Sequence, residues 1–175
     1  TITFEGPSIK TPWFSYPSNG LNPLQISGEE KWRSGDYQGA LEDFDQLIKE
    51  EPNNGYAYYS RASALLELNK PQEALDDANR AIELDPSIPE AYETRGVAKL
   101  MRGDQEGALL DFNSAIELDE NFVSAYSNRG ALKSDLGNYE GALIDLNKAI
   151  EIDPNNVRAY QNRAITHDRN GNITD

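Results

Sequence analysis

Cysteine is absent from this chain of 175 residues, and His167 is its only histidine. Without cysteine the protein has no disulfide, thiol nucleophile or cysteine zinc site, and it suits a reducing or an oxidising compartment equally. A single imidazole cannot build a metal site of several histidines, and a nucleophile paired with it would have to lie near the end of the sequence. We therefore expect no catalytic residue, no metal site and no cofactor, and we interpret His167 as a packing side chain, buried or half-exposed.

Positive charge and long apolar runs are also scarce. Lysine and arginine total 16 against 30 acidic residues, a formal net charge of −14, so the average field repels phosphate backbones and anionic lipid headgroups. No run approaches the roughly 18 apolar residues of a membrane span. We expect neither nucleic acid binding nor membrane insertion. A cytoplasmic location is favoured, and export or an organelle lumen after removal of a targeting segment stays open, since the first residue is Thr1.

The same residues return every 34 positions along most of the chain. The returning pairs are Ala57-Tyr58, Ala91-Tyr92, Ala125-Tyr126 and Ala159-Tyr160, and Arg61, Arg95, Arg129 and Arg163 return in the same register. A fixed period of this length is typical of a repeat array, in which one supersecondary unit is stacked several times. Such arrays lack the enclosed cleft that most enzymes use and present a long concave surface, so the pattern favours a binding protein.

Two helices are predicted within each 34-residue unit. Between Gly55 and Pro86, apolar and small residues recur at steps of three and four in two separate runs. Asn69-Lys70-Pro71 separates these runs, and other units place a glycine and then a capping side chain there, at Gly35-Asp36, Gly103-Asp104, Gly137-Asn138 and Gly171-Asn172. Proline ends most second helices, at Pro52, Pro86 and Pro154. The unit that ends at Asp119-Glu120 lacks this proline, so its boundary is the least defined.

This pattern resembles the tetratricopeptide repeat family from about Leu21 onward. The family expects an aromatic and then a small residue in the first helix, and alanine, a large apolar residue, alanine and a final proline in the second. The matching residues are Tyr92, Gly96, Ala108, Phe112 and Ala115 in one unit, and Tyr126, Gly130, Ala142, Leu146, Ala149 and Pro154 in the next. The resemblance implies an all-α fold, a right-handed α-solenoid of helix-turn-helix repeats over 21–54, 55–88, 89–122 and 123–156, with a partial repeat over 157–175.

Two recurring features have a structural interpretation. Small residues where helices cross, among them Gly96 and Gly130, set the distance between helices, because a larger side chain would separate the backbones. Each of Arg61, Arg95 and Arg129 is followed 16 residues later by an aspartate, at Asp77, Asp111 and Asp145, on the facing helix of the same unit. We predict ion pairs within each unit, and the alternative is a ladder of arginines facing an acidic or phosphorylated ligand.

By the same resemblance, the first helices line a concave groove that holds an extended or helical segment of another protein. Carrying the family's groove positions onto this sequence gives Trp32, Tyr56, Tyr59, Leu66, Glu93, Val97, Leu100, Met101, Asn128, Arg158 and Asn162. The N-terminal part of this set is aromatic and aliphatic with an acidic edge, which predicts a basic flank on the partner. Family members that grip the C-terminal carboxylate of heat-shock chaperones need lysine and asparagine where Glu93 and Val97 stand here, so this mode is doubtful.

Residues 1–20 differ from the repeats. They contain three prolines together with Phe4, Trp13, Phe14 and Tyr16 and show no helical or alternating period, which predicts an extended segment that packs against the array or docks on a partner. We expect a non-enzymatic scaffold or assembly factor that binds proteins. The alternatives are a structural scaffold that self-associates through the solenoid ends, or the regulatory arm of a larger protein. We also expect the native chain to continue past Asp175, because the fifth unit has only its first helix.

Overall fold

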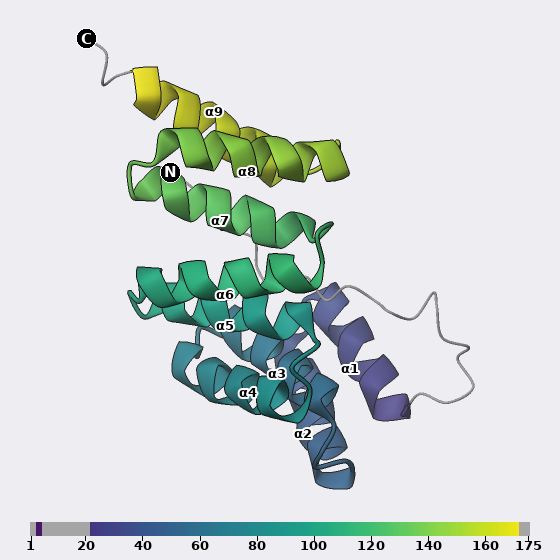
Figure 1. Ribbon diagram of the computed structural model, residues 1–175. Coiled ribbons are helices and arrows are strands. Elements are labelled where there is room, and N and C mark those ends of the chain that lie inside the picture. Colours follow the sequence, from purple (N-terminus) through teal and green to yellow (C-terminus); the bar gives the residue numbers. More distant parts are fainter. Residues whose placement is uncertain (1–2, 5–21, 172–175) are drawn as a thin grey trace.

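The computed structural model describes residues 3–4 and 22–171, and the described residues form nine helices and no strand (Figure 1). The helices are α1 (Pro23–Ser34), α2 (Tyr37–Glu50), α3 (Gly55–Glu67), α4 (Pro71–Leu84), α5 (Pro89–Met101), α6 (Gln105–Leu118), α7 (Val123–Asp135), α8 (Tyr139–Ile152) and α9 (Val157–Gly171). They follow one another as four antiparallel pairs and a ninth helix, which is the predicted all-α, right-handed solenoid.

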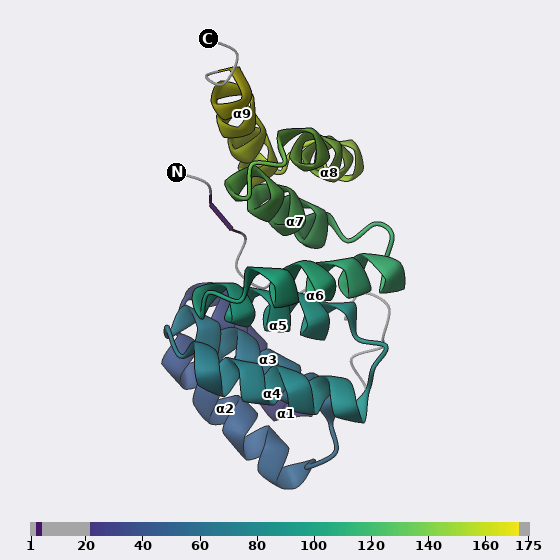
Figure 2. The same cartoon turned by 60° about the vertical axis from the view of Figure 1, so that its left-hand side comes forward.

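The pairs stack into an elongated array with α1 and α2 at one end and α9 at the other (Figures 1 and 2). The first helices of neighbouring pairs contact each other in three cases: α1 with α3, α3 with α5, and α7 with α9. The backbones of α5 and α7 lie farther apart than those of these three pairs. In the part of the chain that the structure describes, no helix is both long enough and apolar enough to cross a membrane.

The turns inside the pairs follow the signals in the sequence. Gly35, Gly103 and Gly137 end three first helices with φ values of +86°, +85° and +81°, in the left-handed region that glycine adopts without strain. Asn69 takes this conformation, with φ of +58°, in the pair that lacks the glycine. In the three pairs with a glycine, the next helix then begins with a side-chain cap, as where Asp104 accepts the backbone N–H of Gly107 at 2.9 Å, whereas α4 begins without one. The predicted helix-turn-helix units are confirmed.

The boundary that lacks proline lies between α6 and α7. The Asp119 carboxylate turns the chain there by accepting the backbone N–H of Asn121 at 2.9 Å, and the aspartates that precede proline elsewhere make the same bond. Phe122 then inserts into the array with no exposed surface and packs in a cluster with Ala115 and Ile116. An aspartate turn and a buried aromatic ring therefore fix the boundary that sequence patterning left undefined.

Glycines stand where the two helices of a pair touch. A Cβ atom added at Gly96 would lie 2.7 Å from the ring of Phe112. One added at Gly130 would lie 2.8 Å from Leu146 and 3.1 Å from the backbone oxygen of Ala142. Such distances are shorter than van der Waals contact, so a larger residue would force the helices apart. The prediction that small residues set the helix spacing is confirmed at these positions.

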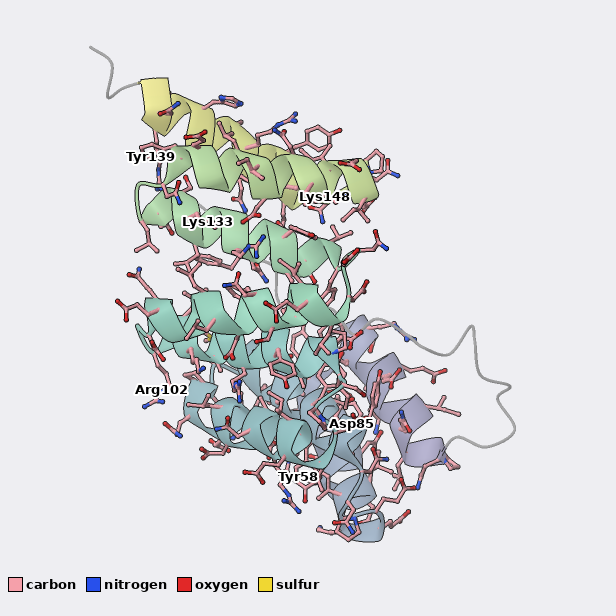
Figure 3. All side chains as sticks on the ribbon, in the orientation of Figure 1. Tyr58, Asp85, Arg102, Lys133, Tyr139 and Lys148 are labelled. Carbon is pink, nitrogen blue, oxygen red and sulfur yellow. The ribbon has the colours of Figure 1, made fainter. Side chains whose placement is uncertain are left out.

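Each predicted ion pair within a unit is present. The arginine–aspartate distances are 2.7 Å for Arg61 and Asp77, 2.7 Å for Arg95 and Asp111, and 2.6 Å for Arg129 and Asp145. Two of these aspartates have a second cation, because Lys99 reaches Asp111 at 2.8 Å and Lys133 reaches Asp145 at 2.7 Å. Lys133, labelled in Figure 3, lies on α7. The arginines are therefore held by carboxylates inside the array, which argues against a ladder that faces an acidic ligand.

These three arginines and Arg163 also bind the preceding pair, which the sequence analysis did not anticipate. Their second acceptors are Asp45 for Arg61, Asn79 for Arg95, Asn113 for Arg129 and Asn147 for Arg163, at 2.7, 3.1, 2.7 and 2.9 Å. These acceptors recur every 34 residues, 16 positions before each arginine, so the signal was present in the sequence. Each arginine links neighbouring helix pairs and so couples the stability of one repeat to the next.

The recurring tyrosine has its explanation in the same column. The guanidinium carbon of Arg95 lies 5.4 Å from the ring centre of Tyr92, and that of Arg129 lies 5.5 Å from the ring centre of Tyr126. A guanidinium stacked over an aromatic face gains cation–π energy of about 0.5–1 kcal/mol at a site this open. The alanine of each Ala-Tyr pair is fully buried, so one residue of the pair packs the helices and the other supports the arginine.

We expect Arg95→Ala to lower the free energy of unfolding by about 1–3 kcal/mol, because Asp111, only 2% exposed, would keep Lys99 alone as its partner. Arg163→Ala is the matched control, since Arg163 binds Asn147 and stacks on Tyr160 but has no facing aspartate among residues 22–171. Its expected loss is below about 1 kcal/mol. Urea titration followed by circular dichroism measures both, and equal losses would contradict the assignment of the buried carboxylate as the cause.

Candidate functional site

The residues predicted to line a groove all lie on the first helices, α1, α3, α5, α7 and α9, and we call the surface of these helices the first-helix face. These residues differ widely in burial. The fully buried ones are Tyr59, Glu93, Asn128 and Asn162, and the nearly buried ones are Leu66 and Val97. The partly buried ones are Trp32, Tyr56 and Leu100, and the exposed ones are Met101 and Arg158. Met101 has 43% of its surface exposed and belongs to none of the hydrophobic clusters of the described residues. The other residues of the set form three connected regions.

Aromatic side chains gather where α1, α3 and α5 meet. The rings of Tyr56 and Tyr59 meet edge to face with centroids 5.1 Å apart, and Trp32 packs in the same cluster. Burial raises the pKa of both tyrosine hydroxyls well above the ordinary value, and the Glu29 and Glu90 carboxylates raise that of Tyr56 further. Both phenols therefore stay protonated at neutral pH and can donate hydrogen bonds.

Two carboxylates are buried beside these rings. Glu29 and Glu93 have almost no exposed surface. The side-chain amide of Asn128 on α7 donates to Glu93 on α5 at 3.2 Å, and a guanidinium nitrogen of Arg33 lies 3.5 Å from Glu29. This end of the first-helix face is therefore an acidic, aromatic environment.

The middle of the first-helix face is aliphatic. Leu66 from α3, Val97 from α5 and Leu132 from α7 are buried in one hydrophobic cluster, and Leu100 packs against it. The side chain of Phe4, from the N-terminal part of the chain, packs against the same cluster. Phe4 is thus held by the same cluster that joins α3, α5 and α7.

The α9 end of the first-helix face binds the backbone of the N-terminal segment. Asn162 Oδ1 accepts the backbone N–H of Thr3 at 3.0 Å, and Asn162 Nδ2 donates to the Thr3 carbonyl oxygen at 2.7 Å. The Arg158 guanidinium donates to the carbonyl oxygen of Phe4. Figure 2 shows residues 3–4, in dark purple, beside α7 and α9. Residues 3–4 therefore lie against the array, as in one of the two alternatives for the N-terminal segment, and residues 1–2 and 5–21 lie outside the described part.

Four buried polar residues form a column along the first helices, and the sequence analysis did not identify them as one feature. Its members are Ser60, Thr94, Asn128 and Asn162, at 34-residue spacing and without exposed surface. The hydroxyl oxygens of Ser60 and Thr94 have no hydrogen-bond partner in the described part of the chain, while Asn128 binds Glu93 and Asn162 binds Thr3. Buried polar atoms without partners are uncommon in folded proteins. The 34-residue period could have revealed this column.

Two contacts between α7 and α9 were also not predicted. The hydroxyl groups of Thr166 and Ser134 are hydrogen-bonded at 3.0 Å, and Arg169 pairs with Asp135 at 2.7 Å. His167 is exposed on α9. The interpretation of His167 as a packing side chain was wrong, since the described part of the chain contains no second helix to cover that face of α9.

Family models described as tetratricopeptide repeat match residues 27–89 and 62–121, residues 123–156, and residues 146–175. The chain belongs to the tetratricopeptide repeat family. The matches span nearly the whole helical array, and they agree with the 34-residue register and the helix pairs described above. No curated protein matches the sequence significantly.

Several solved structures share the fold of this tetratricopeptide repeat protein. MamA is 26% identical, with a TM-score of 0.69 over 85% of this chain and 81% of that one. YrrB, a TPR protein with an unusual peptide-binding site, is 28% identical, with a TM-score of 0.65 over 79% and 71%. The first TPR of Spaghetti (RPAP3), bound to the HSP90 peptide SRMEEVD, is 25% identical, with a TM-score of 0.64 over 66% and 94%.

Proposed function

We propose that this protein is a non-enzymatic interaction module that binds an extended peptide segment of another protein along its first-helix face. The observation that carries the proposal is the pairing of Asn162 with both backbone groups of Thr3, in which a side chain of this face hydrogen-bonds to the backbone of another segment. Two relatives support it, since YrrB has a peptide-binding site and the RPAP3 domain binds a peptide. Such a module serves as a scaffold or an assembly factor.

The chemistry of the face defines the partner. The aliphatic region around Leu100 and the aromatic region around Tyr56 offer apolar contacts, which supply most of the binding energy at small interfaces. The buried Glu93 and Glu29 favour a partner with a lysine or arginine beside its apolar residues. A chaperone C-terminal carboxylate does not suit this end, because Glu93 would repel it.

Self-association is the second candidate function. The observation that favours it is the exposed apolar surface of α9, where 65% of Val157 and 41% of Tyr160 are accessible. Exposed apolar groups at the end of a repeat array are a natural contact for a second array. Sedimentation velocity separates the candidates, since oligomers that grow with concentration favour self-association and a monomer that retains a peptide favours the interaction module.

We expect Tyr56→Ala combined with Leu100→Ala to weaken capture of peptides by about 2 kcal/mol, roughly 30-fold. The probe is a set of peptides selected from a random library on the intact chain, and fluorescence anisotropy measures their affinity. Tyr56 and Leu100 suit this test because both are partly buried, whereas the loss of the fully buried Tyr59 would also lower stability.

The matched control is the combination Leu110→Ala and Ile144→Ala. These two aliphatic residues occupy equivalent positions on the second helices α6 and α8 and are 66% and 64% exposed. The control variant should bind the peptides as the intact chain does. If the control variant lost binding and the Tyr56 and Leu100 variant did not, the peptides would bind to the second helices and not to the first-helix face.

A further inference from the structure

The contact between Asn162 and Thr3 has the geometry of a strand pair. One amide group accepts the N–H and donates to the C=O of a single residue, at 3.0 and 2.7 Å. These two groups point in the same direction only when the residue is extended, as in a β-strand. Asn162 therefore recognises an extended backbone, whatever side chain the bound residue carries. The Thr3 hydroxyl adds a longer contact of 3.4 Å to the same oxygen.

Residue Phe4 supplies the side-chain part of the contact. Its carbonyl oxygen accepts a hydrogen bond from Arg158, one helical turn before Asn162 on α9. Its ring packs against the aliphatic cluster that contains Val97 and Leu132. The two residues thus use the two kinds of contact, backbone hydrogen bonding and an apolar anchor, that a bound peptide would use.

The equivalent asparagine one repeat earlier has a partner within the array. Asn128 occupies the same register on α7 and is equally buried, and its amide donates to Glu93 within the array. The Asn162 amide makes its described side-chain bonds to Thr3. Because an amide without a partner in a buried place costs roughly 1–3 kcal/mol, Asn162 requires a polar ligand such as an extended backbone.

We propose that Thr3–Phe4 is an internal ligand of the first-helix face, and that partner peptides bind by displacing it. This inference rests on the proposed function and adds its specificity and regulation. The partner is an extended peptide in which an aromatic residue directly follows the residue that pairs with Asn162. A partner can bind only those molecules in which Thr3–Phe4 has left the site. The internal ligand therefore lowers the apparent affinity for every partner in proportion to the fraction of molecules whose site is free.

The two contacts also set the direction of the bound chain. Thr3 is held by α9, and the next residue, Phe4, packs against the cluster built from α3 to α7. A partner in the same orientation runs from α9 toward α5, so the residues after its aromatic anchor approach Glu93 and the acidic end of the face. The basic flank of the partner therefore lies C-terminal to the aromatic residue.

The test uses the 175-residue chain and a fluorescein-labelled peptide with the sequence of residues 1–9, TITFEGPSI. Anisotropy should show at least about 10-fold tighter binding of this peptide to the Phe4→Ala chain than to the intact chain, because the variant vacates the site. Within the Phe4→Ala chain, Asn162→Ala and Asn162→Asp should each reduce binding at least about 10-fold, the second because it removes only the donor to the Thr3 carbonyl.

Three controls make the outcome decisive. Asn170→Ala changes an exposed asparagine on the same helix and should leave peptide binding unchanged. A peptide with alanine in place of Phe4 should bind neither chain, and circular dichroism should show unchanged helicity in every variant. Equal binding of the labelled peptide to the intact and Phe4→Ala chains would overturn the proposal. The proposal would also be overturned if the intact chain formed dimers and the Phe4→Ala chain were monomeric, because the segment would then bind to a second copy of the chain.

The peptides selected from the random library separate this proposal from the proposed function. If they bind the intact chain as tightly as the Phe4→Ala chain and still depend on Tyr56 and Leu100, the interaction module stands and the internal ligand is rejected. If they bind neither chain through this face, the proposed function is rejected as well.

Discussion

Replacing Phe122 by alanine should lower the free energy of unfolding by about 3–5 kcal/mol, the cost of removing a fully buried aromatic side chain. Phe122 has no exposed surface and packs with Ala115, Ile116 and Ala125 where α6 passes into α7. No proline rigidifies this boundary, so the ring is the anchor that holds the chain in place. A cavity here would weaken the contact between two helix pairs, and repeat arrays depend on such contacts between neighbours.

The matched control is Ile88→Ala at the equivalent boundary between α4 and α5. Ile88 is only partly buried and is followed by proline, so its loss should cost about 1–2 kcal/mol. Urea titration followed by circular dichroism measures both variants. A cost for Phe122→Ala no larger than that for Ile88→Ala would show that the aspartate turn alone fixes the boundary. A second transition in the Phe122→Ala titration would indicate that α1–α6 and α7–α9 unfold separately.

Replacing Gly130 by valine should lower the free energy of unfolding by about 3 kcal/mol. The new Cβ atom would start 2.8 Å from Leu146 and 3.1 Å from the backbone oxygen of Ala142, so α7 and α8 would have to separate. Valine is a slightly better helix former than glycine, which offsets the cost by only a few tenths of a kcal/mol. The steric cost is larger than this gain, so the substitution should lower the free energy of unfolding.

Ala164 offers the control for this substitution, because it has the same place in the 34-residue register and is exposed on α9. Ala164→Val should cost no more than about 0.7 kcal/mol, the difference in helix propensity. Thermal unfolding followed by circular dichroism compares the two. If Ala164→Val proves as harmful as Gly130→Val, the loss comes from valine in a helix and the close helix contact is not its cause.

Local signals in the sequence were sufficient for the fold. The 34-residue period, Gly103 with Asp104 at a turn, and the aspartate 16 residues after Arg95 each act within one unit or between nearest neighbours. Repeat arrays are nearly one-dimensional, so few contacts join residues that are distant in sequence, and patterns of short range describe most of the structure. The second acceptor of Arg95, Asn79, has the same period and was available to the same reasoning.

Asn162 shows what sequence could say about the candidate site and what it could not. Its place on the first helix follows from the register, and so does its membership of the polar column with Asn128. Its contact with Thr3 does not follow from the register, because Thr3 lies 159 positions away in a segment without any period. The same limit applies to His167, whose exposure depends on what covers α9 and not on its own helix.

The sequence by itself determined the helix pairs, their spacing, their ion pairs and the face that the first helices share, because each depends on residues within about one repeat of each other. Only the tertiary structure decided that Phe4 packs against the aliphatic cluster, that Asn162 binds the backbone of Thr3, and that Phe122 anchors the boundary without proline. These outcomes depend on how the pairs stack and on the contact between Thr3–Phe4 and α9, and neither leaves a periodic trace in the order of the residues.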